Sequence, residues 1–189
     1  MIIKKTSAAE DWNFQTSAIG YGNYLVLNGT GASASAGGGL VSAVSSTTVT
    51  VDSNSYVNSS GATYVMYCFA EKKGYSKFGY YHGNGVADGS FVYTGFKPAF
   101  AIVKCTSHNG ESWWMGDNKR PGYNVSQKAL LAESNAAEVD ASYQAVDFLS
   151  NGIKWRGAND RVNNSGKTYI YMAFGQSLVG SNNVPCTAR

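Results

Sequence analysis

The acidic side chains of this sequence offer the simplest route to catalysis, because glycoside hydrolysis needs only a pair of suitably placed carboxylates. The second half of the chain supplies these candidates: Asp117, Glu133, Glu138, Asp140 and Asp147. Asp117 stands shortly before Arg120, a spacing that favours an ion pair or a turn contact that holds a loop. Glu138 is interpreted in the same way, as an acceptor for loop backbone groups. The carboxylates therefore predict structural contacts rather than a hydrolase.

The histidines give no stronger indication of catalysis. His82 and His108 are the two in the chain, and they lie in separate predicted loops. The sequence contains no G-x-S-x-G elbow, no phosphate-binding loop and no H-E-x-x-H motif. We therefore expect a protein without enzymatic activity and without a cofactor.

The cysteines predict neither a disulfide framework nor a metal site. Cys68, Cys105 and Cys186 are odd in number and show no C-x-x-C spacing. We expect them to be buried thiols that act as small apolar side chains.

Aromatic residues are the remaining candidates for a functional surface, because their flat apolar faces and polar tips suit sugar rings. Four of them are candidate contacts for a glycan or a partner protein: Tyr80, Tyr81, Tyr123 and Trp113. Packing in the core is the alternative role for each, and the sequence leaves both open.

The composition indicates an ordered, nearly neutral protein that is rich in glycine and tyrosine. Only 14% of the 189 residues are charged, whereas about 25% is usual. The net charge of +3 is spread over single basic residues, so a nucleic-acid partner, which needs a clustered basic face, is not expected. No apolar run approaches the ~20 residues of a membrane span.

The strands that would position these side chains occur twice in the sequence. Residues 57–70, VNSSGATYVMYCFA, and residues 162–175, VNNSGKTYIYMAFG, are identical at seven positions with a constant offset of 105. Each copy begins with turn-forming Asn, Ser and Gly and continues with Thr, Tyr, Val, Ile and Phe, which favour a strand. The pattern indicates an internal duplication.

The repeat also sets the predicted domain boundaries. Residues 1–7 match residues 101–107, whereas residues 75–101 occur only once and carry turn signals such as Gly83-Asn84-Gly85. We predict a first unit, 1–74, that lacks its leading strands, and a second, complete unit, 75–189, with a C-terminal tail.

Short strands between turn signals predict an all-β protein with little helix, built as two tandem related β-sandwich or jelly-roll-like units. Residues 63–69 and 168–174 are expected to be equivalent central strands, with Tyr64 and Tyr169 in the same packing role. Without its leading strands, the first unit should expose a sheet edge at residues 2–5. We expect a neighbouring subunit or partner to cover this edge, or upstream residues if the chain is a fragment of a longer protein.

Several segments also resemble a known domain. They are YSKFG at 75–79, GNG at 83–85, DG at 88–89, DFLSNG at 147–152 and YIYMAF at 169–174. Together they resemble a domain of unknown function that recurs in tail-fibre and other virion proteins of bacteriophages, many of them marine, often beside laminin-G-like modules.

This resemblance implies a non-enzymatic structural component of a virion, in a tail fibre or in a head or tail appendage. Its implied partners are other virion proteins and copies of itself, with a trimer as one arrangement. A glycan-binding module for host attachment is the alternative, and a virion enzyme that degrades polysaccharide is the third hypothesis.

Overall fold

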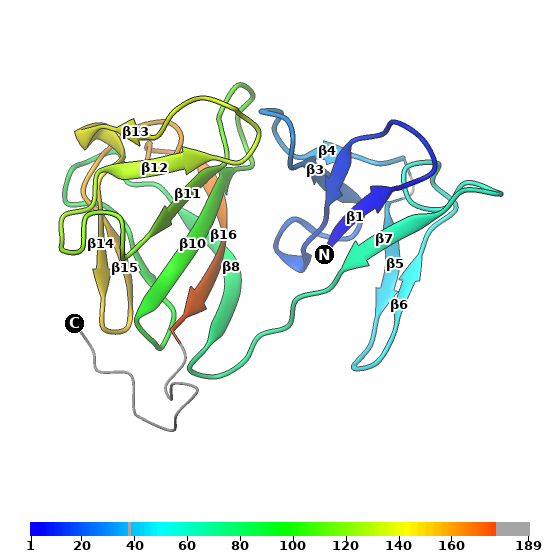
Figure 1. The fold of residues 1–189 in the computed structure, drawn as a ribbon, viewed down its shortest axis with the longest axis horizontal. Helices are drawn as coiled ribbons and strands as arrows, with labels where there is room; N and C mark the ends of the chain where they lie inside the picture. The colour runs from blue at the N-terminus through cyan, green and yellow to red at the C-terminus, as the bar shows by residue number, and fades with distance from the viewer. Residues whose placement is uncertain (38, 177–189) are drawn as a thin grey trace.

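The structure is a computed structural model that describes residues 1–37 and 39–176 (Figure 1). The described residues form sixteen β-strands and two short 3-10 helices and contain no α-helix, which confirms the all-β class. The predicted C-terminal tail beyond residue 176, with Cys186, lies outside the described residues.

Residues 1–74 are called the first unit below and residues 75–176 the second unit. The first unit contains β1 (Ile2–Lys5), β2 (Trp12–Phe14), η1 (Ser17–Ile19), β3 (Asn23–Val26), β4 (Ala34–Ser35), β5 (Val41–Val44), β6 (Val49–Val51) and β7 (Tyr64–Tyr67). The second unit contains β8 (Ser76–His82), β9 (Phe91–Tyr93), β10 (Pro98–Cys105), β11 (Trp114–Asp117), β12 (Lys128–Leu131), β13 (Val139–Asp140), η2 (Ser142–Gln144), β14 (Val146–Leu149), β15 (Gly152–Trp155) and β16 (Thr168–Gly175).

The first unit is an antiparallel sheet in the order β4-β3-β2-β1-β7, accompanied by the separate hairpin β5-β6. Successive side chains of β1 point to opposite faces of this sheet. Ile3 therefore packs with Leu40 and Val41 of the hairpin region and with Val57, whereas Ile2 packs toward the second unit.

The second unit has a larger sheet, β13-β12-β11-β10-β16-β8, and a three-stranded sheet, β14-β15-β9. Its core contains side chains from both sheets, and the rings of Trp114 and Trp155 meet edge to face with centroids 5.0 Å apart. Leu149 pairs with Gly152, so a tight turn at residues 150–151 joins β14 and β15 in a hairpin.

The two larger sheets pair their strands in the same register. Lys5 pairs with Tyr64 in the first unit, and Cys105 pairs with Tyr169 in the second. The outer strands pair in the same register as well. Asn23 pairs with Ser35 in the first unit, and Lys128 pairs with Asp140, 105 residues further on, in the second. Each position in the two ladders therefore has a counterpart.

The prediction that residues 63–69 form a central strand is wrong. β7 is the edge strand of its sheet, whereas its counterpart β16 lies between β10 and β8. The difference arises because β8 has no equivalent among the strands described in the first unit. Tyr64 is therefore half-buried, although Tyr169 is fully buried.

The unpaired edge of the first unit's larger sheet does not lie at residues 2–5, where it was predicted. β1 lies between β2 and β7 and is paired on both sides, so residues 2–5 are not an edge. The open edge belongs instead to β7. The predicted edge at residues 2–5 is therefore wrong, because the segment that occurs only once adds its strand next to β16 rather than next to β10.

The two units share an apolar core between their larger sheets, which stand side by side in Figure 1. Phe14 and Leu25 from the first unit pack with Trp113, Ile170 and Met172 from the second. The faces in contact are counterparts of one another in the two sheets. This core fixes the two units to each other through apolar side chains.

Lys104 is fully buried at this junction, where its ammonium group donates hydrogen bonds to backbone carbonyl groups. Its Nζ donates to the carbonyl oxygens of Thr30 at 3.2 Å, Cys105 at 3.1 Å and Glu111 at 2.8 Å. Since Thr30 belongs to the first unit, one ammonium group ties the backbones of both units together. Burial lowers the pKa of Lys104, while nearby anionic groups oppose that shift.

Candidate functional site

The carboxylates considered for catalysis are held in ion pairs. Asp117 Oδ2 lies 2.6 Å from Arg120 Nε, and Glu138 lies 2.8 Å from Arg120 Nη1 and 3.2 Å from Lys128 Nζ. Burial acts to raise the pKa of Asp117, but backbone N–H donors and Arg120 outweigh it and lower that pKa. Arg120 and Lys128 lower the pKa of Glu138. Both groups are ionised at neutral pH, whereas a glycosidase acid must hold its proton.

The other acidic candidates are also in structural positions. Asp147 Oδ2 lies 2.6 Å from Arg156 Nε, and Glu133 accepts the backbone N–H of Trp113 at 3.0 Å. Asp140 is exposed on the short edge strand β13. These contacts support the interpretation that the carboxylates hold loops and strand ends.

His108, Glu111 and Asp160 form a group whose potential ligand atoms lie within 4.8 Å of one another. Lys167 Nζ is 3.0 Å from Asp160 Oδ2 and 3.7 Å from Glu111 Oε1. Hydrogen bonds from Lys167, and then from Asn164, lower the pKa of Asp160. The ammonium group of Lys167 already neutralises the carboxylates that would otherwise bind a cation. An ion-pair network therefore explains the group.

The four aromatic candidates are divided between the surface and the core. Tyr80 and Tyr123 are 58% and 78% exposed, on β8 and on the loop between β11 and β12. Tyr81 is buried and donates to the carbonyl oxygen of Val162 at 2.6 Å, and burial raises its pKa well above the usual value. Trp113 is buried in the core between the units. The structure therefore does not bring the four together, and two of them present no face to a ligand.

The cysteines differ in the same way. Cys105 is fully buried, as predicted, but Cys68 is exposed. The prediction failed for Cys68 because this residue directly follows the edge strand β7, where no neighbouring strand covers it.

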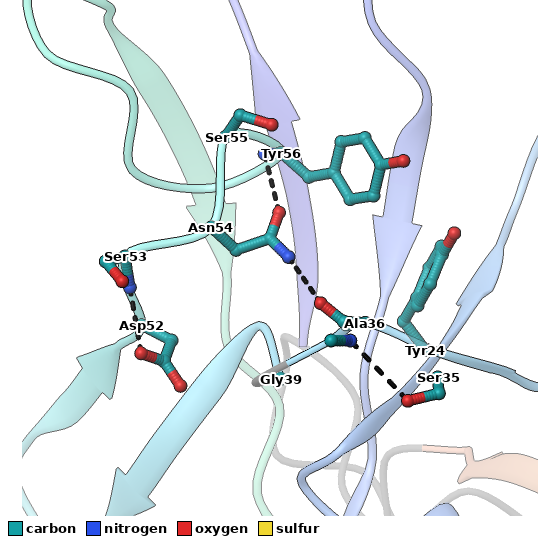
Figure 2. A pocket seen from close by; sticks show the side chains of 10 residues that line it. Tyr24, Ser35, Ala36, Gly39, Asp52, Ser53, Asn54, Ser55 and Tyr56 are labelled. Carbon is teal, nitrogen blue, oxygen red and sulfur yellow. Dashed lines mark hydrogen bonds between the residues drawn. The ribbon is translucent and has the colours of Figure 1, made fainter.

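A hollow of about 460 Å³ opens in the first unit (Figure 2). It is lined by residues of β3, of the end of β4 and the loop after it, and of the turn after β6, namely Tyr24, Ser35, Ala36, Gly37, Gly39, Asp52, Ser53, Asn54, Ser55 and Tyr56. The rings of Tyr24 and Tyr56 lie next to each other, with centroids 5.7 Å apart and planes tilted by 48°. They supply the aromatic part of a surface that is otherwise polar.

Asn54 fixes the shape of this hollow, as the dashed lines in Figure 2 show. Its Oδ1 accepts the backbone N–H of Tyr56 at 2.9 Å, and its Nδ2 donates to the carbonyl oxygen of Ala36 at 2.8 Å. Its own carbonyl oxygen accepts the N–H groups of Val57 at 3.1 Å and Asn58 at 2.8 Å. The turn that carries Tyr56 is therefore held in place before any ligand binds.

Several polar groups of the hollow are available to a ligand. The hydroxyl groups of Ser53 and Ser55 make no hydrogen bond within the described part of the chain. Asp52 Oδ1 accepts the N–H of Ser53 at 2.9 Å, whereas Oδ2 makes neither a hydrogen bond nor an ion pair with a described residue. The pKa of Tyr24 is raised, mainly by burial and to a smaller extent by the neighbouring Tyr56. The hollow thus combines aromatic faces with hydroxyl groups and a carboxylate oxygen.

The counterpart of this hollow in the second unit is filled. At the offset of 105, Arg161 stands in the place of Tyr56 and Ala129 in the place of Tyr24. Arg161 Nη1 donates to Oε1 of the fully buried Gln144 at 2.8 Å. Gly157 lies so close to Tyr143 that a β-carbon there would stand 2.0 Å from a backbone oxygen. The shared turn geometry therefore does not require an open hollow.

The outer edge of β7 is the second candidate site. Among the described strands β7 pairs only with β1. The N–H of Thr6 donates to the carbonyl oxygen of Thr63 at 2.8 Å, and antiparallel ladders alternate inward and outward residues. The backbone groups of Tyr64 and Met66 therefore point away from β1.

β16 shows how the same edge is covered in the second unit. Tyr169 pairs with Tyr81 of β8, and Tyr171 pairs with Gly79. Tyr169 and Tyr171 are the counterparts of Tyr64 and Met66 at the offset of 105. One antiparallel strand therefore satisfies in the second unit the backbone groups that remain open in the first.

A groove of about 690 Å³ runs between the units close to this edge. Its walls include the hairpin tip at residues 45–48, the segment 68–71 after β7, and residues 78–80 of β8. Exposed Tyr80 lies here, with its ring centroid 5.7 Å from that of His82. The groove connects the end of β7 with the surface of the second unit.

No sequence motif marks either site. Tyr24 and Tyr56 are far apart in the chain and belong to no motif. A comparison of the two copies could have found them, since Ala129 and Arg161 replace both tyrosines in the second unit. The open edge could have been assigned to β7 by asking which strand the unique segment 75–101 joins.

Comparisons with known proteins gave one match. A family model described as a domain of unknown function, DUF7483, matches residues 1–177. No curated protein and no solved structure matches the chain. Among the described residues, no helix has the length and apolar character needed to span a membrane.

Proposed function

The chain belongs to the DUF7483 family of domains of unknown function, and we propose that it is a non-enzymatic structural component of a bacteriophage virion. It would act in a tail fibre or in a head or tail appendage, where it associates with copies of itself and with other virion proteins. The observation that carries this proposal is the open edge of β7. The resemblance to virion domains supplies the biological setting.

The composition of β7 supports a role in assembly. Proteins usually protect an exposed edge with Lys, Pro, a bulge or a covering segment. β7 reads Tyr64-Val65-Met66-Tyr67 and contains neither a charge nor a proline. Tyr67 and the following Phe69 are 48% and 42% exposed, so apolar surface flanks the unpaired backbone. A strand added from another chain would pair the backbone and cover these rings.

We also propose that the two units derive from an internal duplication. Matched sequence, strand order and register support this origin, at an offset of 100 for β1 and β10 and of 105 for β7 and β16. In this view the second unit carries its own covering strand, β8, whereas the first unit receives one from a neighbour. A symmetric assembly satisfies that requirement for every copy.

The hypothesis of a polysaccharide-degrading enzyme receives no support from the carboxylates. Asp117 and Glu138 have lowered pKa values and are engaged with Arg120. A glycoside hydrolase of the usual kind needs one carboxyl group with a raised pKa beside an ionised partner.

The test is sedimentation of the full chain over a range of concentrations. We compare the wild type with Tyr67→Lys, which places a charge beside the edge, and with Cys68→Pro, which removes an outward N–H from an exposed position. Tyr143→Lys is the matched control, because Tyr143 is an exposed tyrosine on η2 of the second unit.

We expect the wild type and the control to self-associate and both edge variants to remain monomeric. Protected amides in β1 will show that the edge variants are still folded. A wild type that stays monomeric at every concentration would contradict the proposal, and so would edge variants that associate as well as the wild type.

A further inference from the structure

We infer that the hollow lined by Tyr24 and Tyr56 is a binding site for one neutral pyranose ring of a glycan. This inference goes beyond the proposed role in assembly and rests on different residues. The hollow lies in the first unit, and neither β7 nor its open edge contributes to the lining. Binding there and strand addition at β7 can therefore succeed or fail separately.

The size and shape of the hollow suit a small ligand. Its volume of about 460 Å³ falls within the ~300–1,000 Å³ that is usual for ligand pockets. The turn that carries Tyr56 is held by both ends of the Asn54 side chain, at 2.9 Å and 2.8 Å. A site that is already ordered loses less conformational freedom on binding.

The chemistry of the lining matches a sugar. The rings of Tyr24 and Tyr56 offer apolar faces against which the C–H groups of a pyranose can pack. Around them, the hydroxyl groups of Ser53 and Ser55 can each donate and accept. Asp52 Oδ2 can accept from a sugar hydroxyl, which forms a charge-assisted hydrogen bond. Alternating donors and acceptors beside an aromatic face are what a polyol requires.

The charge of the site selects among sugars. Among the described residues of the lining, Asp52 is the one that carries a charge, and it forms no ion pair with a described residue. The same described lining contains no Lys or Arg, which would recognise a carboxylate or a phosphate. An anionic sugar would be repelled by Asp52, so the site favours a neutral hexose over a uronic acid.

The second unit indicates that this opening is a specific feature of the first. The turns at residues 54–58 and 159–163 make the same backbone hydrogen bonds, to the carbonyl oxygens of Asn54 and Asn159. In the second unit, however, Arg161 and Gln144 occupy the corresponding space. The fold is therefore stable with the hollow filled, and an aromatic-lined opening in the first unit needs another explanation. Ligand binding provides it.

The test uses the full chain labelled with ¹⁵N, titrated separately with glucose, galactose, mannose, N-acetylglucosamine and glucuronic acid. We expect at least one neutral sugar to shift the amide signals of residues 52–56 with a millimolar Kd, the range typical of a weak single-residue ligand. We expect glucuronic acid to bind at least several-fold more weakly than that sugar.

Three variants make the assignment specific. Tyr56→Arg introduces the side chain found in the second unit, and Asp52→Asn removes the charge with little change of shape. Each should weaken binding by about 10-fold, the effect of losing one charge-assisted or packing contact. Tyr143→Ala, which changes an exposed tyrosine on η2 of the second unit, should leave the Kd unchanged.

Three results would overturn the inference. The first is that no sugar of the panel shifts the signals of residues 52–56. The second is that Asp52→Asn binds as tightly as the wild type while its spectrum shows it to be folded. The third is that glucuronic acid binds more tightly than every neutral sugar. None of these results bears on the association of edge variants in sedimentation, so the two proposals are tested independently.

Discussion

The hydroxyl groups of Tyr169 and Tyr64 make equivalent hydrogen bonds in different surroundings, and this pair gives a quantitative prediction. Tyr169 donates to the carbonyl oxygen of Asp160 and accepts the N–H of Asn164, both at 2.8 Å. Tyr64 donates to Ser55 at 3.1 Å and accepts the N–H of Ser59 at 3.0 Å. Replacing either residue by Phe removes both contacts and leaves the ring in place.

Burial decides the cost of each replacement. Tyr169 is fully buried, so Tyr169→Phe leaves an N–H and a C=O without partners, at about 1 kcal/mol or more each. We expect a total loss of about 2–3 kcal/mol in the free energy of unfolding. Tyr64 is half-buried on the edge strand, where water can replace the hydroxyl, so Tyr64→Phe should cost about 1 kcal/mol or less.

Urea unfolding of the full chain measures both values, with a constant m-value showing that the folded and unfolded states are otherwise comparable. Tyr171→Phe is the matched control. Burial raises the pKa of Tyr171 to about 12, and its hydroxyl makes no hydrogen bond within residues 1–37 and 39–176. This control should lose little stability. Equal losses for Tyr64→Phe and Tyr169→Phe would refute the argument from burial, and so would a loss in the control as large as in Tyr169→Phe.

Three further predictions concern charge and exposure. Glu138 has a lowered pKa in the folded state, so its contribution to stability is present above its unfolded pKa of about 4.3 and is lost as the pH falls through the folded value. Arg120→Gln should make this loss of stability at acid pH smaller, as urea unfolding at a series of pH values will show. The same dependence of stability on pH in the variant and the wild type would contradict this prediction. Lys104→Met should destabilise the chain by about 2–5 kcal/mol in urea, because three buried carbonyl groups lose their donor. Because the pKa of Lys104 is lower in the folded state, the free energy of unfolding of the wild type should rise with pH between that folded pKa and the unfolded value of about 10.4. This rise should disappear in Lys104→Met. Iodoacetamide should label Cys68 in the native chain and leave Cys105 unlabelled, as peptide mass spectrometry will show, and equal labelling would contradict the assigned burial.

The sequence alone predicted the elements of the fold well. The turn residues and β-favouring runs predicted short strands. The matches of residues 1–7 with 101–107, at an offset of 100, and of residues 57–70 with 162–175, at an offset of 105, place strands that pair in the same register in the two larger sheets. Local propensity and repetition suffice for this, because each strand and turn is encoded within a few residues.

Packing between segments could not be predicted in the same way. Trp113 follows a loop and has no periodic pattern that marks it as buried, yet the contact between the units encloses it and supplies a partner for its Nε1 in the carbonyl oxygen of Val26 at 2.9 Å. Tyr24 and Tyr56 form the hollow only because β3 and the turn after β6 meet in space. Such features depend on which surfaces face each other, and a single sequence does not state that.

A density map of the assembled particle, at a resolution that separates individual strands, tests the role of β7 most directly. We predict a strand from another chain paired with the outer edge of β7, opposite Tyr64 and Met66, in the position that β8 takes beside β16. An edge of β7 that faces solvent in every copy would refute the proposed role of β7 in assembly, as would an edge covered by the same copy of the chain.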